Sequence, residues 1–351
     1  MKAAVLRELG KPLEITEIET PEPGRDDVLV QVMACGIDGT DLKLLDGFGY
    51  VPDLPFIMGH EVAGIVAEVG SHVSEFKPGD RVVIYNFSYC GKCLLCRTHR
   101  EELCINMAGV LGARGRYGGY ADYCLVPVRQ IVPVPEHVPW PDAAICCDAG
   151  LTAYHALDRG RIHMGESVLI IGVGGVGSMV TQLVKLAGAR AIVAVRSERR
   201  AQQARAMKAD EVIYSTQGNV AQVVHEMTDG LGADCVIDNV GNQETLTYGF
   251  DSLRHGGRLV IVGYTPEVYQ LNGKVTAQNE KEIIGSRAGR LQDLIDTVRL
   301  MASGKFKSIV TETFPLEKAN EALAFLRSGK MLGRAVLLTA AGQKAMGLDT
   351  G

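Results

Sequence analysis

The sequence predicts an α/β protein of two domains, in which a β-rich, barrel-like domain is interrupted by a doubly wound parallel sheet. Short strands between glycine and proline turns fill roughly the first 150 residues, which is typical of an all-β unit. From residue 151 to 287 strands alternate with helices, which indicates a parallel sheet covered by helices. We therefore expect one domain over residues 1–149 and 288–351, a second over 150–287, and a cleft between them.

The β-rich domain is recognised by apolar stretches bounded by turn residues. The expected strands are Val28–Val32, Glu61–Gly70 and Asp80–Ile84, and the turn Lys77-Pro78-Gly79-Asp80 precedes the last of them. Near the C-terminus, a helix over Leu291–Ser303 and a strand over Gly333–Leu338 are expected to return to this domain. The residues after Thr339 are expected to form a frayed tail.

The second domain begins with Val168–Ile171, an uninterrupted apolar run that predicts a strand buried on both faces. Its further expected strands are Ala191–Val195, Glu211–Tyr214, Ala233–Asp238 and Arg258–Val262, and its expected helices are Val176–Leu186, Arg199–Met207 and Val220–Thr228. This alternation is typical of a doubly wound sheet that binds its ligand at the carboxyl ends of the strands.

Composition narrows the class of protein. The chain has 351 residues, enough for two domains, with 46% hydrophobic and 22% charged residues, as in a soluble globular protein. A net charge of −5 argues against nucleic acid or an acidic membrane as the main partner. The N-terminus lacks the apolar core of a signal peptide, and no run reaches the roughly 18 apolar residues of a membrane helix. We expect a cytoplasmic protein.

Four cysteines form the most specific motif. Cys90, Cys93, Cys96 and Cys104 are separated by two, two and seven residues. Closely spaced thiolates in one loop can bind a single tetrahedral zinc, and in a reducing compartment metal is favoured over disulfide. We expect a structural zinc lobe over about residues 88–106. Four thiolates leave the ion no position for substrate, so the lobe is not expected to react. The five other cysteines are expected to be reduced.

A glycine-rich loop follows the first strand of the second domain. Its residues Gly172, Gly174, Gly175, Val176 and Gly177 fit the G-x-G-x-x-G pattern between a buried strand and a helix. The first glycine permits the tight turn, the second lets the backbone approach a pyrophosphate, and the third lets the helix pack on the strand. The helix N-terminus attracts the anion. The loop predicts a dinucleotide site.

The end of the next strand is expected to select the cofactor. An acidic residue there accepts hydrogen bonds from the adenosine ribose, but this chain has Arg196, Ser197 and Arg200. Guanidinium and hydroxyl groups donate to phosphate, so we expect NADP(H) to be preferred over NAD(H). Glu198 is the alternative, because it could take the acidic role.

Three possible metal ligands come from separate segments. Asp38, His60 and Asp148 supply two carboxylates and one imidazole, which could hold a catalytic zinc with a fourth position free for water or substrate. A lone histidine beside a strand is more often structural, so this prediction depends on the three residues meeting. Cys35 or Cys147 could substitute as ligands through a local shift, and a site without metal is a further alternative.

These motifs, in this order, resemble the zinc-dependent medium-chain alcohol dehydrogenases over nearly the whole chain. The resemblance covers Gly36–Leu42, Gly59-His60-Glu61, the segment 77–82, the four-cysteine lobe, Gly150–Ala153, the glycine loop and Gly333-Arg334. It implies a GroES-like β-barrel catalytic domain, a Rossmann nucleotide-binding domain and a homodimer or homotetramer. The chain departs from the family where Asp38 and Asp148 stand at positions that normally carry cysteine ligands. Carboxylates are harder and weaker ligands than thiolates, so zinc is expected to be a stronger Lewis acid and easier to remove.

The resemblance also implies roles for further residues. Thr40 matches the hydroxyl that relays the substrate proton, and Lys43 stands where that relay often has a histidine. Glu61 matches a glutamate that approaches the metal. Asp41 is expected to support the site, paired with Arg334, which also matches a contact to the cofactor phosphate. Thr152, Val240 and Val262 are expected to contact the cofactor.

The expected function is hydride transfer between a secondary alcohol, polyol or sugar, or the matching carbonyl, and NAD(P). Asp38 favours polyols and sugars by resemblance only. One alternative is a zinc-independent, NADPH-dependent reductase of activated alkenes or quinones. The other is a nucleotide-binding protein without catalysis. The metal content separates the first alternative from the main hypothesis, and a turnover screen separates the second.

Overall fold

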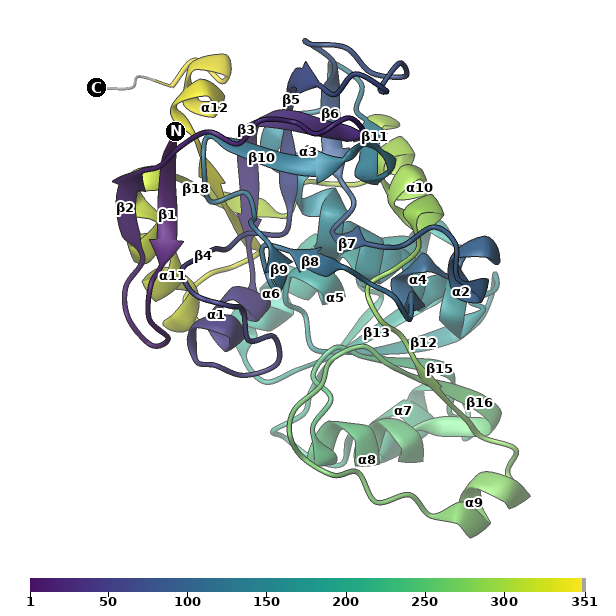
Figure 1. The fold of residues 1–351 in the computed structure, drawn as a ribbon. Helices are drawn as coiled ribbons and strands as arrows, with labels where there is room; N and C mark the ends of the chain where they lie inside the picture. Colours follow the sequence, from purple (N-terminus) through teal and green to yellow (C-terminus); the bar gives the residue numbers. More distant parts are fainter. Residues whose placement is uncertain (349–351) are drawn as a thin grey trace. The chain divides into compact units, whose positions relative to one another are not determined.

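The computed structural model describes residues 1–348 and divides into two compact units (Figure 1). Unit 1 consists of Met1–Asp148, Arg290–Gly304 and the chain from Ser308 onward, and unit 2 consists of Ala149–Gly289 with Lys305–Lys307. Unit 1 is mainly β and unit 2 alternates strands with helices, so the predicted fold class is confirmed. No helix in the described part of the chain is long and apolar enough to cross a membrane.

Unit 1 is built on a seven-stranded sheet with the order β11-β6-β5-β3-β19-β18, in which β10 also pairs with β3. These strands are β3 (Asp27–Ile37), β5 (Val62–Val69), β6 (Arg81–Ile84), β10 (Tyr123–Pro127), β11 (Ile131–Pro133), β18 (Val310–Pro315) and β19 (Arg334–Leu338). Two small sheets complete the unit: β1 (Lys2–Leu6), β2 (Glu14–Glu17) and β4 (Phe56–Ile57) form one, and β7 (Phe87–Ser88), β8 (Gly109–Leu111) and β9 (Gly115–Arg116) the other.

The long strand β3 organises unit 1. It is apolar and almost wholly buried, and it pairs antiparallel with β5, β10 and β19. Pairing along both edges satisfies the backbone groups of a strand that has little contact with solvent. The strand ends at Ile37, immediately before Asp38, and β5 begins just after His60 and Glu61. The central pair of strands therefore brings both segments to the same end of the sheet.

Short helices connect and cover these strands. They are α1 (Gly39–Leu45), α2 (Leu94–Arg97), α3 (Trp140–Ile145), α10 (Leu291–Ala302), α11 (Ala319–Arg327) and α12 (Ala340–Ala345). Single 3₁₀ turns lie at Glu101–Leu103, Val128–Gln130 and Leu316–Lys318, and a π-helix over Cys146–Gly150 continues α3. Strand β18 and helix α11 were not among the predicted elements.

The expectation of a frayed tail after Thr339 is wrong for the residues that the structure describes. Helix α12 begins there, capped by the Thr339 hydroxyl, which accepts from the Gly342 N–H and donates to the carbonyl of Val32 on β3. A Cβ at Gly342 would lie 1.9 Å from the carbonyl oxygen of Met33, so a glycine is needed for the helix to pack against this strand. Residues 349–351 lie outside the described part.

Unit 2 contains a six-stranded sheet with the order β14-β13-β12-β15-β16-β17, and all its pairings are parallel. The strands are β12 (Ser167–Ile171), β13 (Arg190–Val195), β14 (Glu211–Tyr214), β15 (Ala233–Asp238), β16 (Leu253–Ile261) and β17 (Glu282–Gly285). The helices are α4 (Leu151–Gly160), α5 (Gly175–Leu186), α6 (Glu198–Ala206), α7 (Val220–Met227), α8 (Gln243–Asp251) and α9 (Gly273–Gln278). Figure 1 shows α4 and α5 on one face of this sheet and α7 and α8 on the other.

The central strand β12 explains why its sequence is continuously apolar. Val168, Leu169, Ile170 and Ile171 are all at most 1% exposed, because helices cover both faces of the sheet. The order of strands reverses beside β12, where β13 lies on one side and β15 on the other. The loops that follow these three strands meet at the carboxyl edge of the sheet, where doubly wound folds bind ligands.

One predicted boundary in unit 2 differs clearly from the structure. Strand β16 runs from Leu253 to Ile261, whereas the sequence predicts Arg258–Val262. Its first half contains His255, Gly256 and Gly257, which are weak strand formers, and the ladder shifts register next to Ala233. The strand begins early because Leu253 pairs with Ala233 on β15, whereas the pairing with β17 covers only Arg258–Ile261.

Candidate active site and metal centres

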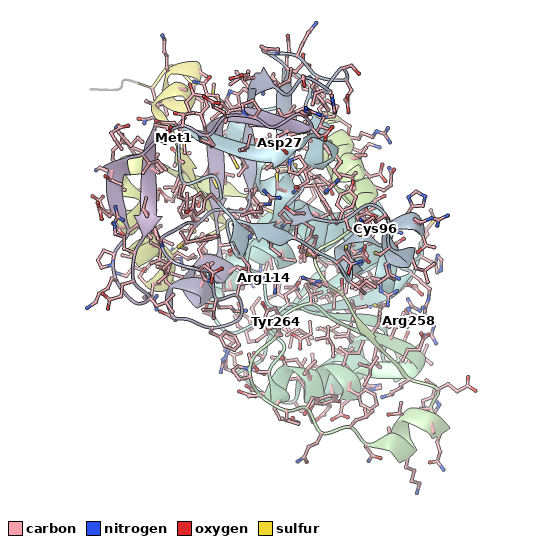
Figure 2. All side chains as sticks on the ribbon, in the orientation of Figure 1. Met1, Asp27, Cys96, Arg114, Arg258 and Tyr264 are labelled. Carbon is pink, nitrogen blue, oxygen red and sulfur yellow. The ribbon has the colours of Figure 1, made fainter. Side chains whose placement is uncertain are left out.

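The four cysteines of the lobe converge on one point. The Sγ atoms of Cys93 and Cys96 lie 3.4 Å apart, those of Cys90 and Cys96 3.9 Å, and those of Cys93 and Cys104 4.0 Å. A tetrahedral zinc with sulfur at about 2.3 Å holds its ligands about 3.8 Å apart, so the four sulfurs fit such an ion. Figure 2 labels Cys96 in this lobe.

Hydrogen bonds from the backbone of the lobe lower the pKa of two of these thiols, Cys90 and Cys93, whereas burial raises the pKa of Cys96 to about 12. The N–H groups of Cys93 and Cys96 donate to the Sγ atoms of Cys90 and Cys93, and the Cys90 N–H donates to the Sγ of Cys104. Hydrogen bonds from the N–H groups of Lys92 and Cys93 lower the pKa of Cys90 to about 6. Donors aimed at sulfur favour the thiolate, which is the form that binds zinc.

The three candidate ligands of a second metal also converge, within unit 1. Asp38 caps the N-terminus of α1, directly after β3. His60 lies between β4 and β5, and Asp148 lies on the π-helix that follows α3. One donor atom from each of the three lies within 4.8 Å of the other two. Insertion of a π-turn into a helix is frequent at functional sites, and here it carries Asp148.

The spacing of these donors suits a cation better than direct hydrogen bonds. The Nε2 atom of His60 lies 3.7 Å from an oxygen of Asp38 and 3.9 Å from an oxygen of Asp148, which is too long for hydrogen bonding. Zinc bonds of about 2.0–2.2 Å to nitrogen and oxygen require donors about 3.4 Å apart, so a small contraction would bring all three onto one ion.

Asp41 lies behind His60, on the side away from Asp38 and Asp148. Its Oδ1 atom is 3.8 Å from the Nδ1 of His60, and both atoms are buried without a hydrogen-bond partner. Its Oδ2 accepts from the hydroxyl of the buried Tyr120 and from the N–H of Asp38. A proton on Nδ1 facing Asp41 would leave Nε2 as the atom that binds metal, which is how outer carboxylates orient metal-bound histidines.

The cluster carries more acid than base. Its acidic members are Asp38, Asp41, Glu61 and Asp148, and its basic members are His60 and Arg334. A histidine that binds metal is neutral, so the four carboxylates and the one guanidinium of Arg334 leave an excess of negative charge that a divalent cation would reduce. This excess of negative charge and the convergence of one donor atom from each of Asp38, His60 and Asp148 fit a zinc ion.

The pKa values follow from the same crowding. Burial opposes a charge on His60, but the carboxylates around it, first that of Asp38, outweigh burial and raise the pKa of His60 to about 9. Burial raises the pKa of Glu61 to about 8, and burial together with the charge of Asp38 raises the pKa of Asp41 to about 6. The metal-free cluster therefore retains protons that zinc would displace.

Glu61 and Arg334 form a buried ion pair beside the ligands. The guanidinium of Arg334 binds the Glu61 carboxylate and donates through Nε to the carbonyl of Ile37 at 3.2 Å. A Cβ at Gly36 would lie 1.8 Å from a Glu61 oxygen, so the carboxylate depends on a glycine at that position. The prediction that Asp41 pairs with Arg334 is wrong, because the guanidinium binds the Glu61 carboxylate and Asp41 accepts a hydrogen bond from Tyr120.

We expect Arg334→Met to lower the free energy of unfolding by about 3–5 kcal/mol, because the buried Glu61 carboxylate loses its guanidinium. Urea denaturation followed by circular dichroism measures this. The double variant Glu61→Gln/Arg334→Met removes both charges and is expected to lose less stability than the sum of the two single variants. Additive losses would contradict the pairing.

The two alternative cysteine ligands point elsewhere in the structure. The Sγ of Cys35 contacts the carbonyl of Gly36 at 3.7 Å, and the Sγ of Cys147 contacts the carbonyl of Val62 at 3.3 Å. Burial raises the pKa of both thiols well above the usual value. A protonated thiol bound to a carbonyl is a poor metal ligand, which favours Asp38 and Asp148.

In unit 2 the glycine-rich loop has the backbone that the sequence predicts. Gly172 has a φ of +81°, and a Cβ at Gly177 would lie 2.0 Å from the Gly172 carbonyl oxygen. Gly174 is exposed, a Cβ there would meet no atom within 4 Å, and the residue precedes the first turn of α5. With no side chain there to cap the helix, the first N–H groups of α5 suit a pyrophosphate. The loop therefore fits a dinucleotide.

A pocket of about 360 Å³ adjoins this loop. Its walls come from the carboxyl ends of β12 and β13 and from the segment around the start of α8. Its lining includes Gly172, Val173, Gly174, Arg196, Ser197, Arg200, Ser215, Val240, Glu244, Thr245 and Tyr248. The alternative acid Glu198 instead binds Arg205 and the hydroxyl of Tyr214. The predicted basic residues are thus on the pocket, and Glu198 is engaged elsewhere.

The remaining predicted site residues lie as follows. Thr40 is on α1, and its hydroxyl donates to Asp38 at 3.1 Å. Lys43 is one turn further along the same helix. Thr152 is buried near the start of α4, and Val262 follows β16. Arg334 belongs to the cluster around His60, so its contact with a cofactor stays a prediction, as do those of Thr152 and Val262.

Several residues of these sites were not singled out from the sequence, among them Ser215, Thr245 and Tyr248 of the pocket lining. Glu244 lines the nucleotide pocket from the first turn of α8, and Tyr120 binds Asp41. The loop after β15 meets the loops after β12 and β13 only because β15 neighbours β12 in the sheet. Strand order is not visible in a single sequence, although an acid near a predicted helix start is a weak signal.

Comparisons with known proteins agree with this geometry. The alcohol dehydrogenase GroES-like domain family matches residues 24–136, and the zinc-binding dehydrogenase family matches residues 175–303. An alcohol dehydrogenase of Geobacillus stearothermophilus is 35% identical, over 96% of this chain and 99% of that protein. The D-arabinose 1-dehydrogenase (NADP(+)) of Saccharolobus solfataricus is 33% identical, over 96% and 97%. A crystal structure of an NAD-dependent alcohol dehydrogenase matches with a TM-score of 0.89 at 31% identity, over 96% and 99%. The chain therefore belongs to the zinc-type medium-chain dehydrogenase/reductase family.

Proposed function

We propose that this chain is a zinc-dependent oxidoreductase that transfers hydride between a secondary alcohol, polyol or sugar, or the matching carbonyl, and NAD(P). The observation that carries the proposal is the convergence of Asp38, His60 and Asp148, three ligands of which none is a thiolate. Relatives named as alcohol and D-arabinose dehydrogenases support the substrate class. Three protein ligands leave a tetrahedral zinc one position for substrate.

Zinc held by these residues would lower the pKa of the substrate hydroxyl and polarise the matching carbonyl. The Thr40 hydroxyl donates to Asp38 in this structure. To relay a proton it would turn from Asp38, accept the proton of the substrate hydroxyl and release its own proton to a neighbouring base. Lys43 follows three residues later, on the same side of α1; in its neutral amine form it would be the base that accepts this proton and then releases it to solvent. Asp41, bound by Tyr120, would keep the His60 ring in its metal-binding orientation.

The nucleotide pocket of unit 2 would supply the hydride donor or acceptor. The loop around Gly174 and the start of α5 would bind the pyrophosphate, and the pocket beyond it the adenosine. Arg196 and Arg200 place two guanidinium groups on that pocket, which supports a preference for NADP(H) over NAD(H). The cofactor carries the chemistry, and the protein positions it.

Metal analysis together with a turnover screen tests the proposal. The expected result is two zinc ions per chain and reduction of NADP⁺ by members of a panel of secondary alcohols, polyols and sugars, with a lower kcat/KM for NAD⁺. One zinc per chain, with NADPH-dependent reduction of activated alkenes or quinones, would replace the proposal by the zinc-independent reductase. Tight nucleotide binding without turnover over the whole panel would indicate a protein that does not catalyse.

A further inference from the structure

The nucleotide pocket contains an acidic residue on the wall opposite its arginines. Glu244 comes from the first turn of α8, whereas Arg196 and Arg200 come from the segment after β13. An oxygen of Glu244 lies 4.0 Å from a guanidinium nitrogen of Arg196, and both side chains are largely exposed, at 63% and 75%. The pocket therefore holds its own carboxylate within reach of the arginine that is expected to bind phosphate.

An acid near a helix start also has an ordinary explanation, since it interacts well with the helix dipole. Asn242 already caps α8, however, and its side chain and that of Thr245 satisfy the exposed N–H groups reciprocally. The position of the Glu244 carboxylate on the pocket, facing Arg196, is not required by that role. The Glu244 carboxylate adds a hydrogen-bond acceptor to the nucleotide pocket, to which the segment after β13 contributes Arg196 and Ser197.

We propose that Glu244 determines the balance between NAD(H) and NADP(H) in this chain. With NAD(H), the carboxylate neutralises Arg196 and accepts hydrogen bonds from the adenosine ribose. With NADP(H), the 2′-phosphate has to replace Glu244 as the partner of Arg196 and is repelled by its charge. The pocket thus accepts both cofactors, and Glu244 limits a preference for NADP(H) that the arginines create.

This inference rests on the proposed function, namely that the pocket binds the adenosine half of a nicotinamide cofactor. The exposed pair of Glu244 and Arg196 is weak, as surface ion pairs are, so a phosphate can displace the carboxylate. Repulsion between one carboxylate and a doubly charged phosphate a few ångströms apart in water amounts to about a tenfold change in affinity.

Calorimetric titration of the full chain with two adenosine probes tests the inference without turnover or zinc. The probes are 5′-AMP and 2′,5′-ADP, which differ by the 2′-phosphate. Glu244→Gln is expected to tighten the binding of 2′,5′-ADP about tenfold, and not that of 5′-AMP. In a protein that also carries Arg196→Gln, Glu244→Gln is expected to increase the affinity for 2′,5′-ADP by a smaller factor, because no Arg196 guanidinium is left to bind the 2′-phosphate.

Glu226→Gln is the matched control. Glu226 is exposed on α7, outside the pocket lining, and its replacement removes the same charge. An unchanged ratio of the two affinities in Glu244→Gln, or an equal change in Glu226→Gln, would overturn the inference. If the unmodified chain bound neither probe, the proposed function would fail at its nucleotide pocket, which is a different result from binding without any effect of Glu244.

Discussion

Replacing His60 by alanine is expected to lower the zinc content from two ions per chain to one and to reduce kcat/KM by at least about a thousandfold. His60 is the only nitrogen ligand in the set with Asp38 and Asp148, and its Nε2 atom lies between their oxygens. Two carboxylates alone are poor zinc ligands. Inductively coupled plasma mass spectrometry measures the metal, and steady-state kinetics with the best substrate measures the turnover.

Two variants serve as controls for this prediction. His72→Ala makes the same change at an exposed histidine paired with Asp26, and it is expected to retain both ions and full activity. Asp38→Cys exchanges one ligand type for another, so it is expected to keep both ions while binding the second more tightly. Full turnover in His60→Ala, or two ions per chain in that variant, would show that this cluster is not a catalytic zinc site.

The second large effect concerns stability. Cys104→Ser is expected to remove the zinc of the lobe and to lower the melting temperature by about 5 °C or more. The lobe contributes little apolar core of its own: Leu94 and Ile105 are 75% and 74% exposed, so the metal replaces hydrophobic packing there. Differential scanning fluorimetry and metal analysis measure the two effects.

Loss of zinc from the lobe is expected to destabilise neighbouring structure as well. Glu101 accepts a hydrogen bond from the N–H of Leu291 at 2.6 Å, which links the lobe to the first turn of α10. When the lobe opens, α10 loses this bond, and trypsin is expected to cut at Lys92 or Arg97. Cys235→Ser, at a buried cysteine of unit 2, is expected to keep both ions. A Cys104→Ser protein that resists trypsin and keeps two ions would disprove the structural role of the metal.

The parts of the fold that the sequence predicts well are those in which local pattern and tertiary environment agree. The strand Ala233–Asp238 and the helix after the glycine loop are confirmed almost to the residue. In both segments the apolar pattern and the positions of the glycines favour the same secondary structure as the tertiary packing does. Strand β16 begins earlier than predicted because Leu253 pairs with Ala233 on β15, and helix α12 forms where its first residues pack on β3. Neither contact can be recognised from the local residues.

The candidate sites show the same division. The sequence identified Asp38, His60 and Asp148 as possible ligands, but it paired Asp41 with Arg334 and missed the contact of Tyr120 with Asp41. Which groups pair in a buried charged cluster depends on small differences in distance between segments that lie far apart in the sequence. Such distances depend on how β3, β5 and β19 align, which periodicity and spacing do not report.

By itself the sequence determined the family, the two-domain α/β fold, the four-cysteine lobe and the phosphate loop, because each depends on residue types at short, fixed spacings. Only the tertiary structure decided that Asp38, His60 and Asp148 meet, that Glu61 holds Arg334, and that Glu244 faces Arg196. Those residues lie far apart in the chain, and the order and register of the strands bring them together.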